Sequence, residues 1–284
     1  LRIDEKHGFY VDFYRSDNAI SNDYLYHNIG DSVILYTQDG KVLKQDEVSS
    51  YPCVGEDLPG LRYFRSVRTT GLNESTVVAL FSARLLNTGT SYMKMWIPAS
   101  SDVSYFTALA PGAKTASSPY QSKPSLVVTM RKEKPAVKEP FVVVYEPISD
   151  ELSADLIESV DRIKLDPLGK ESCAIKVKTK KGDTFTLVNI LKDGPVILNN
   201  QKCCADFAIF AKRKGKNSVY VGNGSFVENK DFKIESENRG SFYIEYDQTS
   251  LLVRSNCPIK IQAKNGMLKE PFYLTGGERI IKME

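Results

Sequence analysis

The sequence predicts an all-β protein, built as a large antiparallel β-sandwich followed by a smaller C-terminal β-domain. Apolar and polar residues alternate with a period of two along most of the chain, as in strands that have one solvated face. Turn pairs such as Asp39-Gly40 separate the alternating runs, which is typical of hairpins. Because helical apolar spacing is confined to residues 150–163, packed antiparallel sheets are the favoured architecture.

The N-terminal half contains several expected strands. The first covers residues 9–14, where aromatic and aliphatic side chains alternate with tyrosine and acidic ones, and residues 32–43 form a hairpin. The runs 125–130 (SLVVTM) and 141–147 (FVVVYEP) are continuously apolar, as expected for strands that are covered on both faces. Residues 107–125 are rich in Ala, Ser, Pro and Gly and indicate a long surface loop.

The C-terminal half repeats the hairpin pattern. Residues 174–191 turn at Gly182-Asp183, with the lysines of the first strand expected on the outer face. A second turn is expected at Asn223-Gly224, and residues 240–255 alternate with a period of two. Both patterns indicate further antiparallel strands.

Two features leave the organisation of the chain partly open. Residues 150–163 fit either a short helix or a lead into a strand. Turn residues in the stretch 191–204 precede a new series of hairpins, so we place the domain boundary around residue 200. The expected domains are 1–199, a large sandwich, and 200–284, a smaller one.

Composition and charge exclude several classes of protein. The chain of 284 residues is 42% hydrophobic and 26% charged, as in ordinary globular proteins. Its net charge of +3 comes from dispersed residues, so no nucleic-acid partner is indicated. No apolar run approaches the roughly 20 residues that span a bilayer, and no signal peptide is recognisable at the start. The chain is expected to begin inside a longer polypeptide.

Cofactor and catalytic motifs are not recognisable. The five cysteines form no CxxC pair and the two histidines cannot complete a zinc pattern. Cys203 and Cys204 are expected on opposite faces of a strand. No G-x-S-x-G, G-x-G-x-x-G or P-loop occurs. We therefore expect no metal and no cofactor, and assign no catalytic residue.

Two short stretches contain candidate substrate-binding residues. In LRYFRSVR, Arg62 and Arg65 flank aromatic residues, and such a stretch binds an anionic polymer through guanidinium–carboxylate pairs and ring stacking. The alternative is a strand with its arginines in solvent. His27 lies next to Tyr26 and near Tyr24, either as a packed ring that is hydrogen-bonded beside these tyrosines or as a residue that lines a cleft.

The same region carries a family resemblance. The stretch YVDFYRSDNAISNDYLYHNIGDSVIL resembles a segment of the heparinase II/III-like polysaccharide lyases that has a D-x-F-R pattern followed by H-D-Y-x-x-H. Asp12 to Arg15 match the first pattern and Asn22 to His27 the second, with Asn22 in place of the first histidine. A later R…F-V-x-V-x-E-P strand pair is matched by the following residues: Arg131, Phe141, Glu146 and Pro147. The resemblance covers roughly residues 9–165.

The resemblance implies a function. Such lyases join a helical toroid to a β-sandwich and cleave uronic-acid-containing polysaccharides, glycosaminoglycans among them, by β-elimination, in the periplasm or outside the cell. Their H-x-H-x-D and H-N-T segments and the toroid are absent here. The chain would thus be an inactive β-sandwich part that supports an upstream toroid, binds an anionic polysaccharide and lines its cleft. The alternatives are a non-catalytic carbohydrate-binding module and a structural β-module.

Overall fold

The computed structural model describes residues 1–52, 60–85, 89–112, 124–149, 155–165, 171–191, 194–198, 201–264, 268 and 270–282. The chain divides into two compact units, Leu1–Val160 and Asp161–Glu284. In the described ranges it is almost entirely β, with no α-helix and with one short 3-10 helix, η1 (Leu61–Tyr63). No helix in these ranges is long and apolar enough to cross a membrane.

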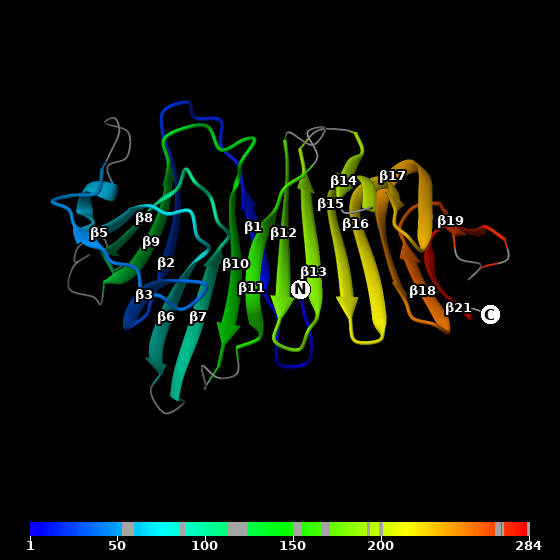
Figure 1. Cartoon of the computed structure of the whole chain (residues 1–284), viewed down its shortest axis with the longest axis horizontal. Coiled ribbons are helices and arrows are strands. Elements are labelled where there is room, and N and C mark those ends of the chain that lie inside the picture. Colours follow the sequence, from blue (N-terminus) through cyan, green and yellow to red (C-terminus); the bar gives the residue numbers. More distant parts are fainter. Residues whose placement is uncertain are drawn as a thin grey trace. The chain divides into compact units, whose positions relative to one another are not determined.

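The first unit contains two antiparallel five-stranded sheets (Figure 1). In chain order, the first sheet has the following strands: β1 (Tyr10–Tyr14), β3 (Ser32–Thr37), β6 (Val77–Leu85), β7 (Gly89–Ile97) and β10 (Phe141–Ile148). The second sheet has the following strands: β2 (Asn22–Asn28), β4 (Asp46–Glu47), β5 (Arg65–Leu72), β8 (Ser104–Ala110) and β9 (Ser125–Lys132). Their orders are β1-β10-β7-β6-β3 and β2-β9-β8-β5-β4.

A shared apolar core makes these two sheets a sandwich. Phe81, Met95 and Val143 from the first sheet are packed with Val128 and Met130 from the second, and all five are at most 1% exposed. Nearly every side chain of β9 and most of those of β10 are buried, on both strand faces. This confirms the prediction that the two continuously apolar runs are covered on both sides.

The strand β11 (Ile157–Ile163) spans the division between the units. Residues 150–154 lie outside the described ranges, but from Ile157 onward the segment is a strand, so the second of the two sequence interpretations holds. The expected loop at 107–125 is shorter than predicted, because β8 continues to Ala110; residues 113–123 are also outside the described ranges.

The second unit holds the larger sheet, in which the long strands β15 (Gln201–Arg213) and β16 (Lys216–Glu228) form a central hairpin (Figure 1). The main path of this sheet begins with β11, and its other strands are β12 (Ser172–Thr179), β13 (Thr184–Ile190), β17 (Phe232–Tyr246), β18 (Ser250–Ser255) and β21 (Gly277–Lys282). Off this path are β14 (Val196–Leu198), β19 (Ile259–Ala263) and β20 (Phe272–Leu274). One apolar cluster, which includes Val221, Ile234, Phe242 and Val253, forms its core.

The predicted turn at Asn223-Gly224 is wrong. Both residues lie inside β16 (Lys216–Glu228), and the hairpin with β15 (Gln201–Arg213) turns at Gly215, whose φ is 76°. Pairing between β16 and β17 shifts register around Gly224, while Asn223 has a φ of 49°. Asn-Gly tolerates positive φ in a bulge as well as in a turn, so the sequence pair alone did not distinguish the two.

Other local predictions are confirmed. Gly40 and Gly182 form tight turns with φ of 87° and 85°. Cys203 is buried and Cys204 is partly exposed, as expected for opposite faces of β15. The predicted boundary at 199/200 falls on residues outside the described ranges and within the second unit by number, and it stays a prediction.

Candidate functional site

The strand β2 carries three of the five predicted site residues, and it divides them between its two faces. Tyr24 and Tyr26 point into the sandwich, where the ring of Tyr26 lies 5.3 Å from that of Phe81. His27 points the other way, because successive side chains of a strand alternate, and its ring lies 6.2 Å from that of Phe64. The prediction that the His27 ring packs beside Tyr24 and Tyr26 is therefore wrong.

His27 is exposed on the outer face of the second sheet. Its partial burial lowers the pKa of the imidazole, since burial disfavours the charged form. The lowered pKa favours the neutral ring, in which one nitrogen donates a hydrogen bond and the other accepts.

Arg62 and Arg65 belong to the chain segment that contains Phe64, whose ring lies beside His27. Arg62 belongs to η1, and its guanidinium carbon lies 5.9 Å from the ring centre of Tyr63, which is 50% exposed. Arg65 is the exposed first residue of β5. Phe64 packs against the apolar cluster on the outer face of this sheet and touches His27, which fixes the segment beside the histidine.

We call His27, Arg62, Tyr63 and Arg65 the outer-face patch. It combines an exposed phenol ring, two guanidinium groups and a neutral imidazole. A sugar ring can stack on the phenol, and guanidinium groups pair with carboxylate or sulfate through charge-assisted hydrogen bonds. The patch thus has the chemistry of a binding surface for an anionic saccharide.

Tyr24 has a different environment, at the edge strands of the two sheets. Its hydroxyl donates a hydrogen bond to Asp12 Oδ2 at 2.7 Å, and the Tyr145 hydroxyl lies 2.7 Å away on its other side. Burial and these hydrogen bonds raise the pKa of Tyr24, and burial raises the pKa of Tyr145. Both phenols therefore stay protonated, and the three side chains link β1, β2 and β10.

Two of the residues that carry the family resemblance, Arg131 and Glu146, have structural roles. Arg131 is 3% exposed and donates from Nε and Nη2 to the two carboxylate oxygens of Asp23, each at 2.8 Å. Arg131 also donates to the carbonyl of Pro52 and lies over the ring of Tyr51, at 5.0 Å. This arrangement holds the segment around residues 51–52 on the outer face of the second sheet.

Glu146 has a comparable role at the other sheet. Its carboxylate is 1% exposed and accepts the indole N–H of Trp96 at 3.0 Å and the backbone N–H of Ile157 at 2.8 Å. It also accepts the backbone N–H of Leu156. With three donors and almost no access to solvent, this carboxylate is suited to hold β11 in place rather than to accept a proton from a substrate.

Sequence reasoning included Tyr63 in the LRYFRSVR stretch as a ring for stacking, but it did not find a groove lined by lysines in the second unit. Alternation correctly places Lys176 on an exposed face between buried Ile175 and Val177. That Lys212 shares this face depends on the pairing of β12, β13 and β15, for which the sequence offers no direct sign.

No known family model matches the chain. The chain is 31% identical over 258 residues to an endo-acting ulvan lyase of Formosa agariphila, an alignment that covers 88% of this chain. The chain is related to a polysaccharide lyase. It spans 27% of the length of that lyase.

Proposed function

We propose that this chain is the β-sandwich part of a heparinase II/III-like polysaccharide lyase that cleaves a uronic-acid-containing polysaccharide by β-elimination. The observation that carries the proposal is the similarity to an endo-acting ulvan lyase over 88% of the chain. In this proposal a helical toroid elsewhere in the same polypeptide provides the catalytic groups. A secreted or periplasmic location is part of the proposal, since the substrate is a polysaccharide.

The outer-face patch gives the sandwich its role. His27, Arg62, Tyr63 and Arg65 provide an exposed ring and two cations, so we assign this surface to hold the polysaccharide beside the catalytic domain. Tyr24 and Tyr26, which were expected at the site, face the core of the sandwich instead. We therefore assign them to support β2 rather than to touch substrate.

A second candidate function is a carbohydrate-binding module without catalysis. The patch favours it, because the patch offers cations and a ring but its one imidazole has no carboxylate partner in the described residues, and a general base is usually oriented by such a partner. The two candidates share the binding surface and differ in whether the longer polypeptide cleaves what it binds.

The first experiment separates these candidates. The chain alone, and a longer polypeptide that includes the residues before Leu1, are incubated with ulvan, heparin, heparan sulfate, chondroitin sulfate and alginate. Elimination produces an unsaturated uronate, which absorbs in the ultraviolet. We expect turnover of at least one substrate by the longer polypeptide and none by the chain alone. A longer polypeptide that binds but never cleaves would favour the binding module.

The second experiment tests the patch. The double variant Arg62→Ala/Arg65→Ala should bind the polysaccharide at least about 100-fold more weakly in affinity electrophoresis, since it loses two charge-assisted hydrogen bonds that contribute about 1.5–3 kcal/mol each. Arg279→Ala removes an exposed arginine in the second unit and serves as the matched control. Equal retardation of the double variant and the control would exclude the patch from binding.

A further inference from the structure

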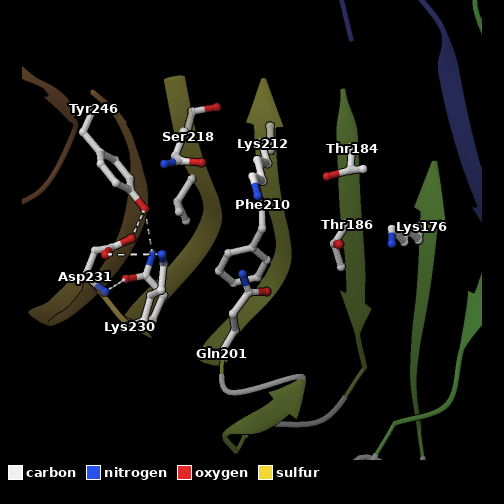
Figure 2. Close-up of a pocket in the computed structure, with 14 residues that line it drawn as sticks. Lys176, Thr184, Thr186, Gln201, Phe210, Lys212, Ser218, Lys230, Asp231 and Tyr246 are labelled. Atoms are coloured by element: carbon white, nitrogen blue, oxygen red, sulfur yellow. Dashed lines mark hydrogen bonds and ion pairs between the residues drawn. The ribbon is translucent and has the colours of Figure 1, made fainter. Parts of the chain in front are cut away.

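The second unit contains a polar groove that the outer-face patch does not account for. It has a volume of about 400 Å³, which falls in the range of roughly 300–1,000 Å³ typical of ligand sites. Figure 2 shows that its lining comes from neighbouring strands of the sheet and from the turn that follows β16. Its polar lining includes Lys176, Thr184, Thr186, Gln201, Lys212 and Asp231.

Strand register explains why these side chains gather. Lys176 is paired with Thr186, and Thr186 with Phe210. Two residues away along β13, Thr184 is paired with Lys212, which is paired with Asn217. Residues that are paired directly point to the same face of a sheet, so two adjacent rows of side chains line one wall of the groove.

The groove has an excess of positive charge. Lys176 and Lys212 are exposed, and neither makes an ion pair within the described ranges. Lys230 is also exposed, with its ammonium 4.0 Å from a carboxylate oxygen of Asp231. Asp231 is the acidic residue among those that line the groove, against three lysines.

The carboxylate of Asp231 does not cancel this charge at the open side. Asp231 is 5% exposed and accepts a hydrogen bond from the hydroxyl of Tyr246 at 2.8 Å, as the dashed lines of Figure 2 show. Asn229 fixes the turn by accepting the backbone N–H groups of Asp231 and Phe232 at 2.8 and 2.7 Å. The acid is thus part of the floor, while Lys176 and Lys212 face solvent.

The neutral lining defines the ligand further. Hydroxyl and amide side chains, among them Thr184, Thr186 and Gln201, both donate and accept hydrogen bonds. Groups of this kind match the hydroxyls of a sugar, while the lysines match a carboxylate or sulfate. Phe210, which contributes to the floor, adds an apolar surface for the face of a sugar ring.

We propose that this groove is a second saccharide-binding site, which holds a sugar unit that carries a carboxylate or sulfate. The inference deepens the proposed function, on which it rests for the identity of the polymer; the lysines and the polar lining stand independently of it. The site lies in the second unit and is built from residues separate from those of the outer-face patch.

The test uses the full chain and three probes: ulvan oligosaccharides, the same oligosaccharides after chemical reduction of their carboxylates and removal of their sulfates, and free glucuronate. Binding is measured by calorimetry, and the site of binding by NMR shifts of the lining threonines. The double variant Lys176→Gln/Lys212→Gln should weaken binding of ulvan oligosaccharides about tenfold and abolish the shifts at Thr184 and Thr186. Lys282→Gln, an exposed lysine of β21, is the matched control.

The outcomes separate this inference from the proposed function. If the charged oligosaccharides bind and the double variant changes neither their affinity nor the threonine shifts, the groove proposal is wrong while the proposed function stands. If glucuronate shifts the threonines but no oligosaccharide binds anywhere on the chain, the groove proposal stands and the proposed function fails. Equal binding of the neutralised probe would also overturn the groove proposal, because it assigns the lysines to an anion.

Discussion

Both units are built from antiparallel strands, but they differ in the charged residues that they bury. In the first unit Lys94, Arg131 and Lys132 are all buried, and each is paired with an acid. In the second unit the lysines are at the surface, and Asp231 is the one charged residue among the buried residues of its described part. The same fold class is therefore stabilised by different interactions in the two units.

The difference follows from the connections between strands. The buried pairs of the first unit hold non-repetitive segments onto the sheets. Arg131 donates to the carbonyl of Pro52, and Lys132 donates to Asp102 and to the carbonyl of Glu139. The second unit relies on tight turns such as those at Gly182 and Gly215. A short hairpin needs no such support, which leaves Lys176 and Lys212 available for a ligand.

The largest expected effect breaks one of the buried pairs. Arg131→Met should destabilise the first unit by roughly 3–5 kcal/mol, because it leaves Asp23 buried without its partner. Urea unfolding followed by circular dichroism measures the change. Arg254→Met removes an exposed cation that pairs with Glu278 in the second unit and should cost at most about 1 kcal/mol. Equal costs in the two units would refute the comparison.

The next effect concerns packing in the second unit. A Cβ at Gly224 would lie 2.5 Å from Val221 Cγ1 and 2.6 Å from the Cβ of Ala205. Gly224→Ala should therefore destabilise the bulge by about 1–3 kcal/mol. At Gly182, where nothing lies within 4 Å of such a Cβ but φ is 85°, an alanine should cost less, about 1 kcal/mol. If calorimetric melting shows a larger loss of stability for Gly182→Ala than for Gly224→Ala, backbone strain outweighs crowding at these positions.

A smaller effect depends on pH. Burial alone would raise the pKa of Asp102, but hydrogen bonds from Ser100 and Lys132 lower it to about 2. A carboxyl with a lowered pKa stabilises the fold above its unfolded pKa, near 4, and that contribution is lost as pH falls from about 4 to about 2. The stability of Asp102→Asn should decline less steeply across this window than that of the native chain. Parallel acid-unfolding curves would contradict this assignment.

The smallest expected effect comes from removing exposed lysines, in contrast to the buried arginine of the first prediction. Lys176→Gln/Lys212→Gln should change the melting temperature very little, with a free-energy change within about 0.5 kcal/mol, since neither ammonium has an ion-pair partner in the described structure. A loss above 2 kcal/mol would mean that these lysines are structural, like the buried cations of the first unit.

Much of the fold follows from local patterns in the sequence. The alternation of Phe242 and Ile244 with Tyr243 and the apolar run of β10 predict burial directly, because side-chain direction along a strand has a fixed period. The prediction of a turn at Asn223-Gly224 was wrong because the same backbone dihedral angles occur in a β-bulge. Whether such a pair forms a turn or a bulge depends on the strand that pairs with it.

The site was less predictable for the same reason. The sequence indicated Arg62, Arg65 and His27 as binding candidates, and in the structure the ring of His27 lies beside Phe64, which stands between the two arginines in the chain. Tyr24 and Tyr26 lie on the opposite face of β2 from His27. The alternation of side chains along a strand implies this separation, although the three residues are close together in the sequence. The lysine groove depends on strand register between distant segments, so no local pattern revealed it.

The hydrogen bond between Trp96 and Glu146 makes the first unit optically distinct. Trp96 is the single tryptophan of the chain, it is 4% exposed, and its indole donates to a buried carboxylate that also binds the start of β11. Its fluorescence therefore reports on the first unit alone, at the point where the chain enters β11. The emission spectrum of this natural probe can follow the melting of one unit in the intact chain, with no label and no truncation.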